Sequence, residues 1–267
     1  FPSTAKYIAI STLEAGLDVV SMAPTSTKVF ILEVMGRNAG WIAAASALAS
    51  NDKSKPPHII LFPEVAFDCA KFLKQVDICV KKYGFCTIIA AEGIKNTEGI
   101  FLSMQNESGD SFGHNQLGGV SAKLASLIKD NLGYKYHFAL ADYLQRSARH
   151  IASKVDVDCA YNIGEQAVVR ALSGKNAIML TLNRFNAKSN DKTKWVIGEV
   201  ALNKVCNVEI SLPENDIDGT GFGITQKCRD YLEPLIQGEA YPPYKDGMPK
   251  YGDFLYSEQG SEVIADS

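Results

Sequence analysis

The sequence has few of the features by which metal centres, membrane segments and nucleic-acid surfaces are commonly found. Its six cysteines are scattered without a C-x-x-C pair, and its four histidines show no short spacing that would suggest a zinc site. Its longest apolar stretches, such as residues 41–49, stop well short of the roughly 20 residues that a membrane-spanning helix needs. Lys and Arg number 27 against 30 Asp and Glu, which gives a net charge of −3 without a basic block. These absences argue against a zinc protein, a membrane protein and a nucleic-acid binder, and they fit reduced thiols in the cytoplasm.

Signatures of several common catalytic sites are also missing. The sequence has no lysine-containing phosphate loop of the Walker type, no G-x-G-x-x-G after a strand, no nucleophile elbow and no Asp-rich metal cluster. The sequence therefore contains residues that can bind a substrate, but it shows no obvious catalytic centre.

What the sequence does contain is an alternation of short apolar strands and helical patterns. Val29–Val34 and Cys86–Ala91 are apolar along most of their length, which is typical of strands covered on both faces in a parallel sheet. Apolar residues at spacings of three and four predict a first helix from Tyr7 to Val20. Strands that alternate with helices indicate the α/β class. The predicted order is helix 7–20, strand 29–34, helix 40–49, strand 59–62, helix 69–83, strand 86–91, helix 120–132, strand 136–141, helix 147–172, strand 177–182 and strand 195–200.

Three stretches are predicted to lie outside these elements. The polar composition after Glu92, as far as Gly119, indicates a long exposed loop or lid. Residues 185–194 read as a polar turn. The tail after Gly238, which is rich in Pro and Gly, is predicted to run over the surface.

Ligands in such sheets gather where the parallel strands end. This rule selects the loops after Val34, Ala91, Ala141 and Leu182, of which the first three carry conspicuous polar side chains. In the loop that follows Val34, Gly36 allows close backbone approach to a ligand, and Arg37 offers paired donors that match a phosphate. Taken alone, Arg37 is equally well explained as half of a surface ion pair.

The other two loops complete a candidate site. A carboxylate such as Glu92 can accept hydrogen bonds from two sugar hydroxyls, although it could equally cap a helix. Tyr143 and Arg146 lie three residues apart at a helix start, so both can face the same anion. The competing interpretation is that Arg146 and Arg149 form a solvated helical face. Together these loops predict a site for two phosphates with Glu92 between them.

Four blocks of the sequence, in the same order, resemble signatures of the 6-phosphofructokinase family. The resemblance extends from about Phe1 to Leu182, and the first and last blocks are more similar to the pyrophosphate-dependent branch than to the ATP-dependent one. The blocks are Glu-Val-Met-Gly-Arg-Asn-Ala-Gly-Trp-Ile-Ala-Ala-Ala at residues 33–45, Ala-Glu-Gly at 91–93, His-Asn-Gln-Leu-Gly-Gly at 114–119, and Asp-Tyr-Leu-Gln-Arg-Ser-Ala-Arg-His-Ile-Ala-Ser at 142–153.

The resemblance implies a three-layer, Rossmann-like architecture around a parallel sheet, incomplete at the N-terminus. It also implies reversible, Mg²⁺-dependent phosphoryl transfer from pyrophosphate to the 1-hydroxyl of fructose 6-phosphate. Two alternatives stay open: ATP as the donor, and a regulatory subunit that binds sugar phosphate without catalysis.

The resemblance also implies roles for individual residues. The loop Met35–Arg37 would hold the sugar phosphate and the transferring group, which makes Arg37 the catalytic candidate. Glu92 would orient the sugar hydroxyls, and Tyr143 and Arg146 would grip the 6-phosphate.

A neighbouring subunit is implied as well. Family members bind the 6-phosphate across a subunit contact, and Lys28 and His137 match the positions that the neighbour contributes. ATP-dependent relatives have arginine at both positions, so the strength and pH dependence of this contact differ here. We therefore expect a homo-oligomer, a dimer or a tetramer, with the substrate site near a subunit contact.

The resemblance suggests a division of labour along the chain. Residues 1–145 are expected to bind the sugar phosphate, and residues 146–267 to complete the phosphoryl-donor half and add a surface tail. Family members begin with a glycine-rich diphosphate-binding loop and a Thr-Ile-Asp-Asn-Asp-like segment that carries the general base, and this sequence contains neither. We expect the Mg²⁺ ligands to lie outside this chain, and the chain alone to bind fructose 6-phosphate without turnover.

Overall fold

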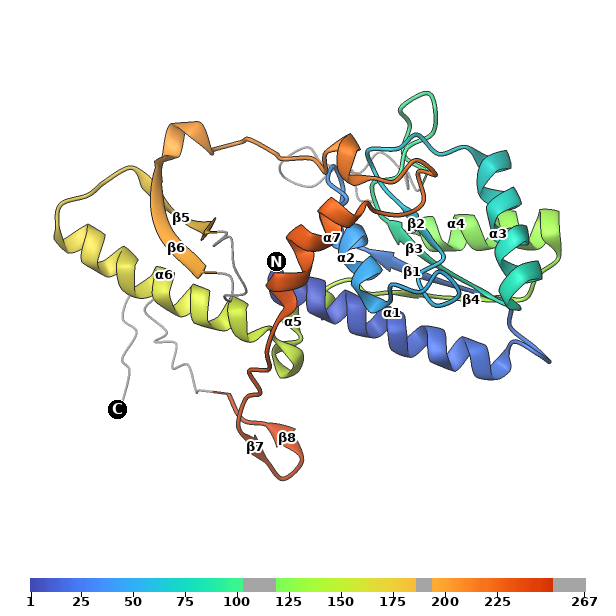
Figure 1. Cartoon of the computed structure of the whole chain (residues 1–267), viewed down its shortest axis with the longest axis horizontal. Coiled ribbons are helices and arrows are strands. Elements are labelled where there is room, and N and C mark those ends of the chain that lie inside the picture. The colour runs from blue at the N-terminus through green and yellow to red at the C-terminus, as the bar shows by residue number, and fades with distance from the viewer. Residues whose placement is uncertain (103–118, 186–193, 252–267) are drawn as a thin grey trace, which may run out of the picture.

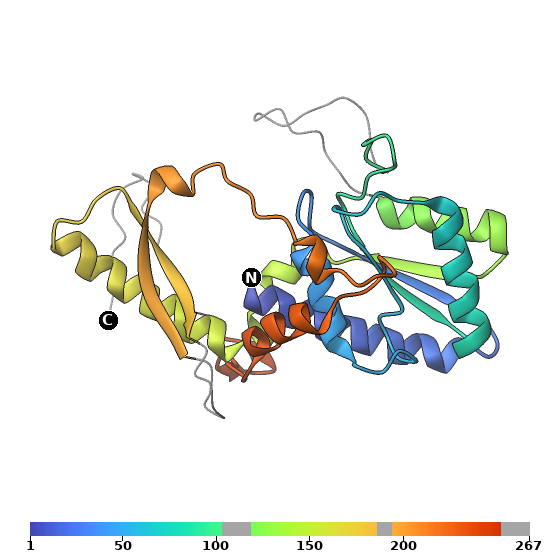
Figure 2. The same ribbon diagram turned by 45° about the horizontal axis from the view of Figure 1, so that its top comes forward.

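A computed structural model describes residues 1–102, 119–185 and 194–251 of the chain. In both views a sheet covered by helices lies at one end of the molecule, and a long helix with a two-stranded ribbon lies at the other (Figures 1 and 2). Among the described residues, no helix combines the length and the apolar character needed to cross a membrane. All six cysteines are free thiols.

The central sheet has four parallel strands in the order β2-β3-β1-β4. The predicted bounds of β1 and β3 are confirmed, since both strands carry almost only apolar side chains and are buried along nearly their whole length. The strands are β1 (Val29–Val34), β2 (Ile59–Leu61), β3 (Cys86–Ala91) and β4 (Tyr136–Leu140).

Helices cover both faces of this sheet, so the predicted three-layer α/β fold is confirmed. Helices α1 and α2 contact each other and the 3₁₀ helix η1 on one face, and α3 and α4 contact each other on the other (Figure 2). The helices are α1 (Pro2–Met22), α2 (Trp41–Ala45), η1 (Ser46–Ala49), α3 (Cys69–Tyr83) and α4 (Val120–Leu132).

Local signals explain why α3 and α4 match their predicted bounds. The Asp68 side chain accepts a hydrogen bond from Lys71 N at 3.0 Å and so caps the start of α3. Gly84 and Gly133 end α3 and α4 in the left-handed conformation that glycine adopts without strain.

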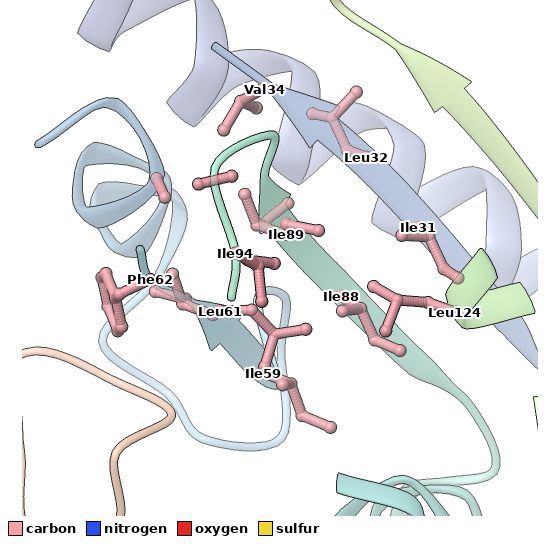
Figure 3. Close-up of a cluster of buried hydrophobic side chains, with 14 of the residues drawn as sticks. Ile31, Leu32, Val34, Ile59, Leu61, Phe62, Ile88, Ile89, Ile94 and Leu124 are labelled. Carbon is pink, nitrogen blue, oxygen red and sulfur yellow. The ribbon is translucent and has the colours of Figure 1, made fainter. Parts of the chain in front are cut away.

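The hydrophobic core lies between the sheet and its helices. Ile31 and Ile88 are register partners on neighbouring strands, and both point toward Leu124 of α4 (Figure 3). All three side chains are fully buried. Burial of such side chains contributes about 1.5–3 kcal/mol each.

The second half of the chain departs from the prediction in two places. The helix expected over 147–172 begins instead at Lys154, because the Ser153 side chain caps its N-terminus. The residues before it form a short helix α5 (Leu144–Ser147) and a 3₁₀ helix η2 (Arg149–Ile151), and the long helix is α6 (Lys154–Leu172).

The last two predicted strands do not join the parallel sheet. They are β5 (Ile178–Phe185) and β6 (Lys194–Ala201), which pair with each other in an antiparallel ribbon. The prediction that Leu182 lies at the ligand-binding edge of the sheet is therefore wrong. A short connection favours antiparallel pairing, whereas a parallel partner needs a longer crossover. The polar turn predicted at residues 185–194 lies almost wholly outside the described residues.

The segment after β6 returns to the central sheet, which the sequence did not reveal. Phe222 O accepts a hydrogen bond from Ile60 N at 2.8 Å at the edge of β2. Leu212, Cys228 and Leu232 are buried in the same core as the sheet. The elements are η3 (Leu202–Lys204), η4 (Glu214–Asp216), α7 (Gln226–Leu232), η5 (Glu233–Ile236), β7 (Tyr244–Lys245) and β8 (Met248–Pro249). As predicted, the part of the tail that the structure describes is largely exposed.

One buried carboxylate joins β1 to α4. Glu33, which is 5% exposed, accepts hydrogen bonds from Ser121 N at 2.8 Å, Ser121 Oγ at 2.7 Å and Gly119 N at 3.1 Å. These are donors at the N-terminus of α4, where the helix dipole favours negative charge. Glu33 therefore fixes α4 against the end of the central strand.

We predict that Glu33→Gln lowers the free energy of unfolding by about 1–3 kcal/mol, because the amide keeps the size of the side chain but loses the charge and one acceptor oxygen. Urea denaturation measures the change. Glu14→Gln, on the exposed side of α1, is the control and is expected to stay within about 0.5 kcal/mol of the wild type. Equal stability of Glu33→Gln and Glu14→Gln would contradict this role.

Candidate functional site

Six of the eight predicted residues follow strands β1, β3 and β4 at one edge of the sheet. Met35, Gly36 and Arg37 come directly after β1, and Glu92 directly after β3. Gly36 N donates a hydrogen bond to Glu92 Oε1 at 3.1 Å, so the first two loops are in contact. Tyr143 and Arg146 follow β4, which neighbours β1 on its other side.

Two glycines allow the first two loops to approach each other. Gly36 has φ +148°, and a Cβ there would lie 2.8 Å from Ala39 O. A Cβ on Gly93 would lie 1.7 Å from Arg37 O, a separation that no side chain tolerates. Gly93 N also donates to Gly36 O at 3.1 Å. The backbone of Arg37 is therefore held against the loop that carries Glu92.

Gln145 ties the third loop to the first, although sequence reasoning did not single it out. Its Oε1 accepts a hydrogen bond from Met35 N at 3.3 Å, and its Nε2 donates to Asp142 O at 2.8 Å. The side chain is 1% exposed. Asp142 itself has φ +38°, an uncommon conformation for a residue other than glycine. The only sequence signal is the position of Gln145 within the block 142–153.

Arg146 and Tyr143 lie together, as their spacing predicts. The guanidinium carbon of Arg146 is 4.3 Å from the centre of the Tyr143 ring. Both side chains are exposed, so the guanidinium and the phenol are accessible to a ligand. A pocket of about 260 Å³ opens beside Arg146 and is also lined by Gln145, Arg149 and Asp156. This geometry suits an anion held by a cation and a hydroxyl.

Arg37 also lies beside an aromatic ring, that of Phe101. Its guanidinium carbon is 5.4 Å from the centre of the Phe101 ring, and Lys95 Nζ is 4.7 Å from the same centre. Phe101 belongs to the loop or lid predicted after Glu92, of which residues 103–118 lie outside the described residues. Of the block at 114–119, only Gly119 is described.

A distant segment supports the loop that carries Arg37. We call residues 209–212 the strap, which leads from the β5–β6 ribbon to α2 (Figure 1). The Asn38 amide donates to both carboxylate oxygens of Glu209, at 3.0 and 2.9 Å, and Trp41 Nε1 donates to Ile210 O at 2.9 Å. The loop that carries Arg37 is thus braced by residues about 170 positions later in the chain.

A single carboxylate oxygen bridges the strap to the end of the same loop. Glu64 Oε1 accepts hydrogen bonds from Gly40 N at 2.8 Å and from Leu212 N at 2.7 Å. Sequence reasoning did not find Glu64 or Glu209, because only the return of the C-terminal segment places them beside the loop.

The structure does not bring Lys28 and His137 together with the other six residues. Lys28 directly precedes β1, so the length of the strand, about 20 Å, separates it from Val34 at the ligand-binding end. Its Nζ donates to Ala23 O after the end of α1. His137 is exposed near the start of β4, where it pairs in register with Phe30. Both residues therefore lie toward the opposite edge of the sheet.

Comparison with known proteins decides the family. The sequence model of the family described as phosphofructokinase matches residues 7–171, more than half of the chain. The chain belongs to the phosphofructokinase family.

Three similar proteins are named for the same pyrophosphate-dependent activity. A protein from Halomonas elongata, named pyrophosphate–fructose 6-phosphate 1-phosphotransferase, is 54% identical over 250 residues, which cover 94% of this chain and 59% of that protein. A structure named pyrophosphate-dependent phosphofructokinase from Nitrosospira multiformis is 53% identical with a TM-score of 0.83, covering 94% of this chain and 59% of its own. One of the same name from Marinobacter aquaeolei is 49% identical with a TM-score of 0.85, covering 100% and 63%. The chain thus spans about three-fifths of the length of these relatives.

A second pocket of the chain lies away from the candidate site. It measures about 460 Å³ and is lined by residues such as His58, Tyr83 and Arg229, next to the starts of β2 and β3. His58 Nδ1 accepts a hydrogen bond from Thr87 N at 3.0 Å, and the ring packs edge-on against Phe85 at 4.7 Å. Burial lowers the pKa of His58 from 6.5 to about 4. The histidine therefore stays neutral in the folded protein at neutral pH.

We predict that the wild type loses up to about 3 kcal/mol of stability as the pH falls from 6.5 to 4, because the unfolded chain takes up a proton at His58 that the folded chain does not. Above pH 6.5 and below pH 4 this contribution is constant. His58→Gln, whose amide oxygen can still accept from Thr87 N, should lack this component. Urea unfolding across this pH range compares it with His137→Gln, a control at an exposed histidine. Identical pH profiles for the wild type and His58→Gln would show that His58 does not carry the effect.

Proposed function

We propose that this chain forms the fructose 6-phosphate-binding part of a phosphofructokinase that uses pyrophosphate as the phosphoryl donor. The reaction transfers a phosphoryl group to the 1-hydroxyl of the sugar and is reversible. The observation that carries this proposal is the hydrogen bond from Gly36 N to Glu92 Oε1, which joins the loop of Arg37 to a carboxylate suited to sugar hydroxyls. The pyrophosphate-dependent activity for which the three relatives described above are named supports pyrophosphate over ATP.

Each side chain has a chemical task in this proposal. Tyr143 and Arg146, with the guanidinium 4.3 Å from the ring centre, hold the 6-phosphate at one end of the sugar. Glu92 accepts hydrogen bonds from sugar hydroxyls and fixes the orientation of the ring. Arg37 neutralises charge on the transferring phosphoryl group, which is the main demand of phosphoryl transfer. Phosphate would be released from the donor as the sugar becomes a bisphosphate.

The magnesium implied for this reaction has no site among the described residues. They contain no group of three or more His, Cys, Asp or Glu side chains that could hold a metal ion. We therefore derive no step from a metal held by this chain and propose that its ligands lie elsewhere in the active enzyme.

The two parts of the chain have different roles in this proposal. Residues 1–145, together with Arg146 at the start of the second part, bind the sugar phosphate, and the rest of residues 146–267 contributes to the donor half. About two-fifths of the length of the relatives has no counterpart here. We propose that turnover needs that remaining part and that the enzyme works in the cytoplasm, in keeping with its free thiols.

We predict that the purified chain binds fructose 6-phosphate and that Arg146→Met weakens this binding by about 10- to 100-fold, since charge-assisted hydrogen bonds are worth about 1.5–3 kcal/mol. Isothermal titration calorimetry measures the affinity. Arg170→Met is the matched control, because Arg170 pairs with Glu199 at 3.3 Å on the β5–β6 ribbon.

The same preparation tests the donor and the division of labour. We expect no formation of fructose 1,6-bisphosphate by the chain alone with pyrophosphate or with ATP. The binding proposal fails if the wild type does not bind fructose 6-phosphate or if both arginine variants lose affinity equally. Pyrophosphate-dependent turnover by the chain alone would refute the claim that the remaining part is required. ATP-dependent turnover would refute the proposal that pyrophosphate is the donor.

We also propose that a second copy of the chain completes the grip on the 6-phosphate through Lys28 and His137. What supports this is their place near the amino ends of β1 and β4, away from Arg146 of their own chain. The phosphate would then be held by cationic groups from two subunits of a homo-oligomer.

Subunit mixing provides the measurement. Arg146→Met and Lys28→Met should each bind fructose 6-phosphate at least about tenfold more weakly than the wild type. After the two variants are mixed and reassembled, a fraction of sites should regain wild-type affinity, because some sites receive both native residues. As a control, Arg146→Met mixed with itself should regain none. A mixture that behaves as the sum of the two variants would contradict a shared site.

A further inference from the structure

Lys95 is a cation at the ligand-binding edge of the sheet, and it has no role in the sugar-phosphate site proposed above. It lies in the loop after β3, three residues beyond Glu92. Its Nζ is 4.7 Å from the centre of the Phe101 ring, and the Arg37 guanidinium carbon is 5.4 Å from the same point. The Phe101 ring thus lies within cation–π distance of cations from two different loops.

The backbone around Lys95 is held in place. Lys95 O accepts a hydrogen bond from Phe67 N at 2.8 Å, and Leu102 N donates to Ile94 O at 3.0 Å. Lys95 and Phe101 form an antiparallel β-bridge. The close approach of Gly93 to Arg37 fixes the start of the same loop. The backbone position from which the Lys95 side chain extends therefore follows from the fold.

The charge of Lys95 has no acidic partner in the part of the chain that the structure describes. The ion pairs formed there involve Lys6, Lys81, Lys154, Arg170, Lys175 and Lys227. The face of Phe101 attracts a cation only modestly. An anion bound at the Lys95 ammonium would supply the opposite charge that the ring lacks.

The strand order gives this anion a place along the site. Arg146 follows β4, Arg37 follows β1 and Lys95 follows β3, and these three strands are neighbours in that order. With about 4.8 Å between strands, the two outer loops start about 10 Å apart. The three loops therefore lie in a row, with the loop of Arg146 at one end and the loop of Lys95 at the other.

We propose that Lys95 binds the phosphate on carbon 1 of fructose 1,6-bisphosphate, which is the phosphoryl group during its transfer. The inference rests on the proposed function, because it takes the 6-phosphate to be bound at Arg146. It adds a second phosphate position and makes Lys95 a residue that distinguishes the bisphosphate from fructose 6-phosphate.

The test compares two probes, fructose 1,6-bisphosphate and fructose 6-phosphate, by calorimetry on the same chain. Lys95→Met removes the charge but keeps an unbranched side chain over Phe101, and it should weaken bisphosphate binding about tenfold while fructose 6-phosphate binding changes less than about twofold. Lys95→Arg should restore most of the bisphosphate affinity. Lys82→Met is the control, since Lys82 Nζ also lies over a ring, 5.0 Å from the centre of Tyr83, at the far end of α3.

Each outcome bears on one proposal or both. Selective loss of bisphosphate affinity in Lys95→Met, with rescue by Lys95→Arg, supports the second phosphate position. Equal loss for both sugars, or no loss, overturns it and leaves the proposed function intact. If the wild type binds neither sugar phosphate, the proposed function fails and this inference fails with it.

Discussion

The parallel register of β1 with its two neighbours is the constraint on which the candidate site depends. Val34 is paired with Ala91 on one side, and Glu33 with Leu140 on the other, so three strands end at one level. The pairing continues one residue further, because Glu92 N donates to Val34 O at 3.0 Å and Ala141 N donates to Glu33 O at 2.9 Å. Polar side chains that are far apart in the sequence are thereby delivered to one edge by a rigid, apolar sheet.

The features that were predictable from the sequence are those that depend on neighbouring residues. The bounds of α3 follow from the cap at Asp68 and the left-handed Gly84, and those of β1 and β3 from short runs of apolar side chains. The features that the sequence did not predict depend on contacts with residues that are distant in the sequence. Nothing in the apolar pattern of residues 178–182 shows that β5 pairs with β6 and not with the central sheet. The burial of Leu212 and its neighbours against that sheet is equally invisible locally.

The site divides in the same way. Glu92 is conspicuous because it is a charged residue directly after an apolar strand, and Arg37 and Arg146 are conspicuous because they follow strands within a few residues. Gln145 and Glu64 are not found, because each acts by satisfying backbone donors of another loop, and those donors are known only once the fold is known. Sequence patterns therefore reveal the groups that can meet a ligand more readily than those that hold them in position.

The strap makes the loop that carries Arg37 dependent on the C-terminal part of the chain. Asn38 and Gly40 obtain partners from Glu209 and, through Glu64, from the backbone of Leu212. Those residues follow the β5–β6 ribbon, so a movement of the ribbon would pull on the loop that carries Arg37. In a reaction in which donor and acceptor must be aligned together, such a connection lets the position of one half of the enzyme set the geometry of the other. The loop, the strap and the ribbon are therefore mechanically connected, although more than 160 residues separate the loop from the strap in the sequence.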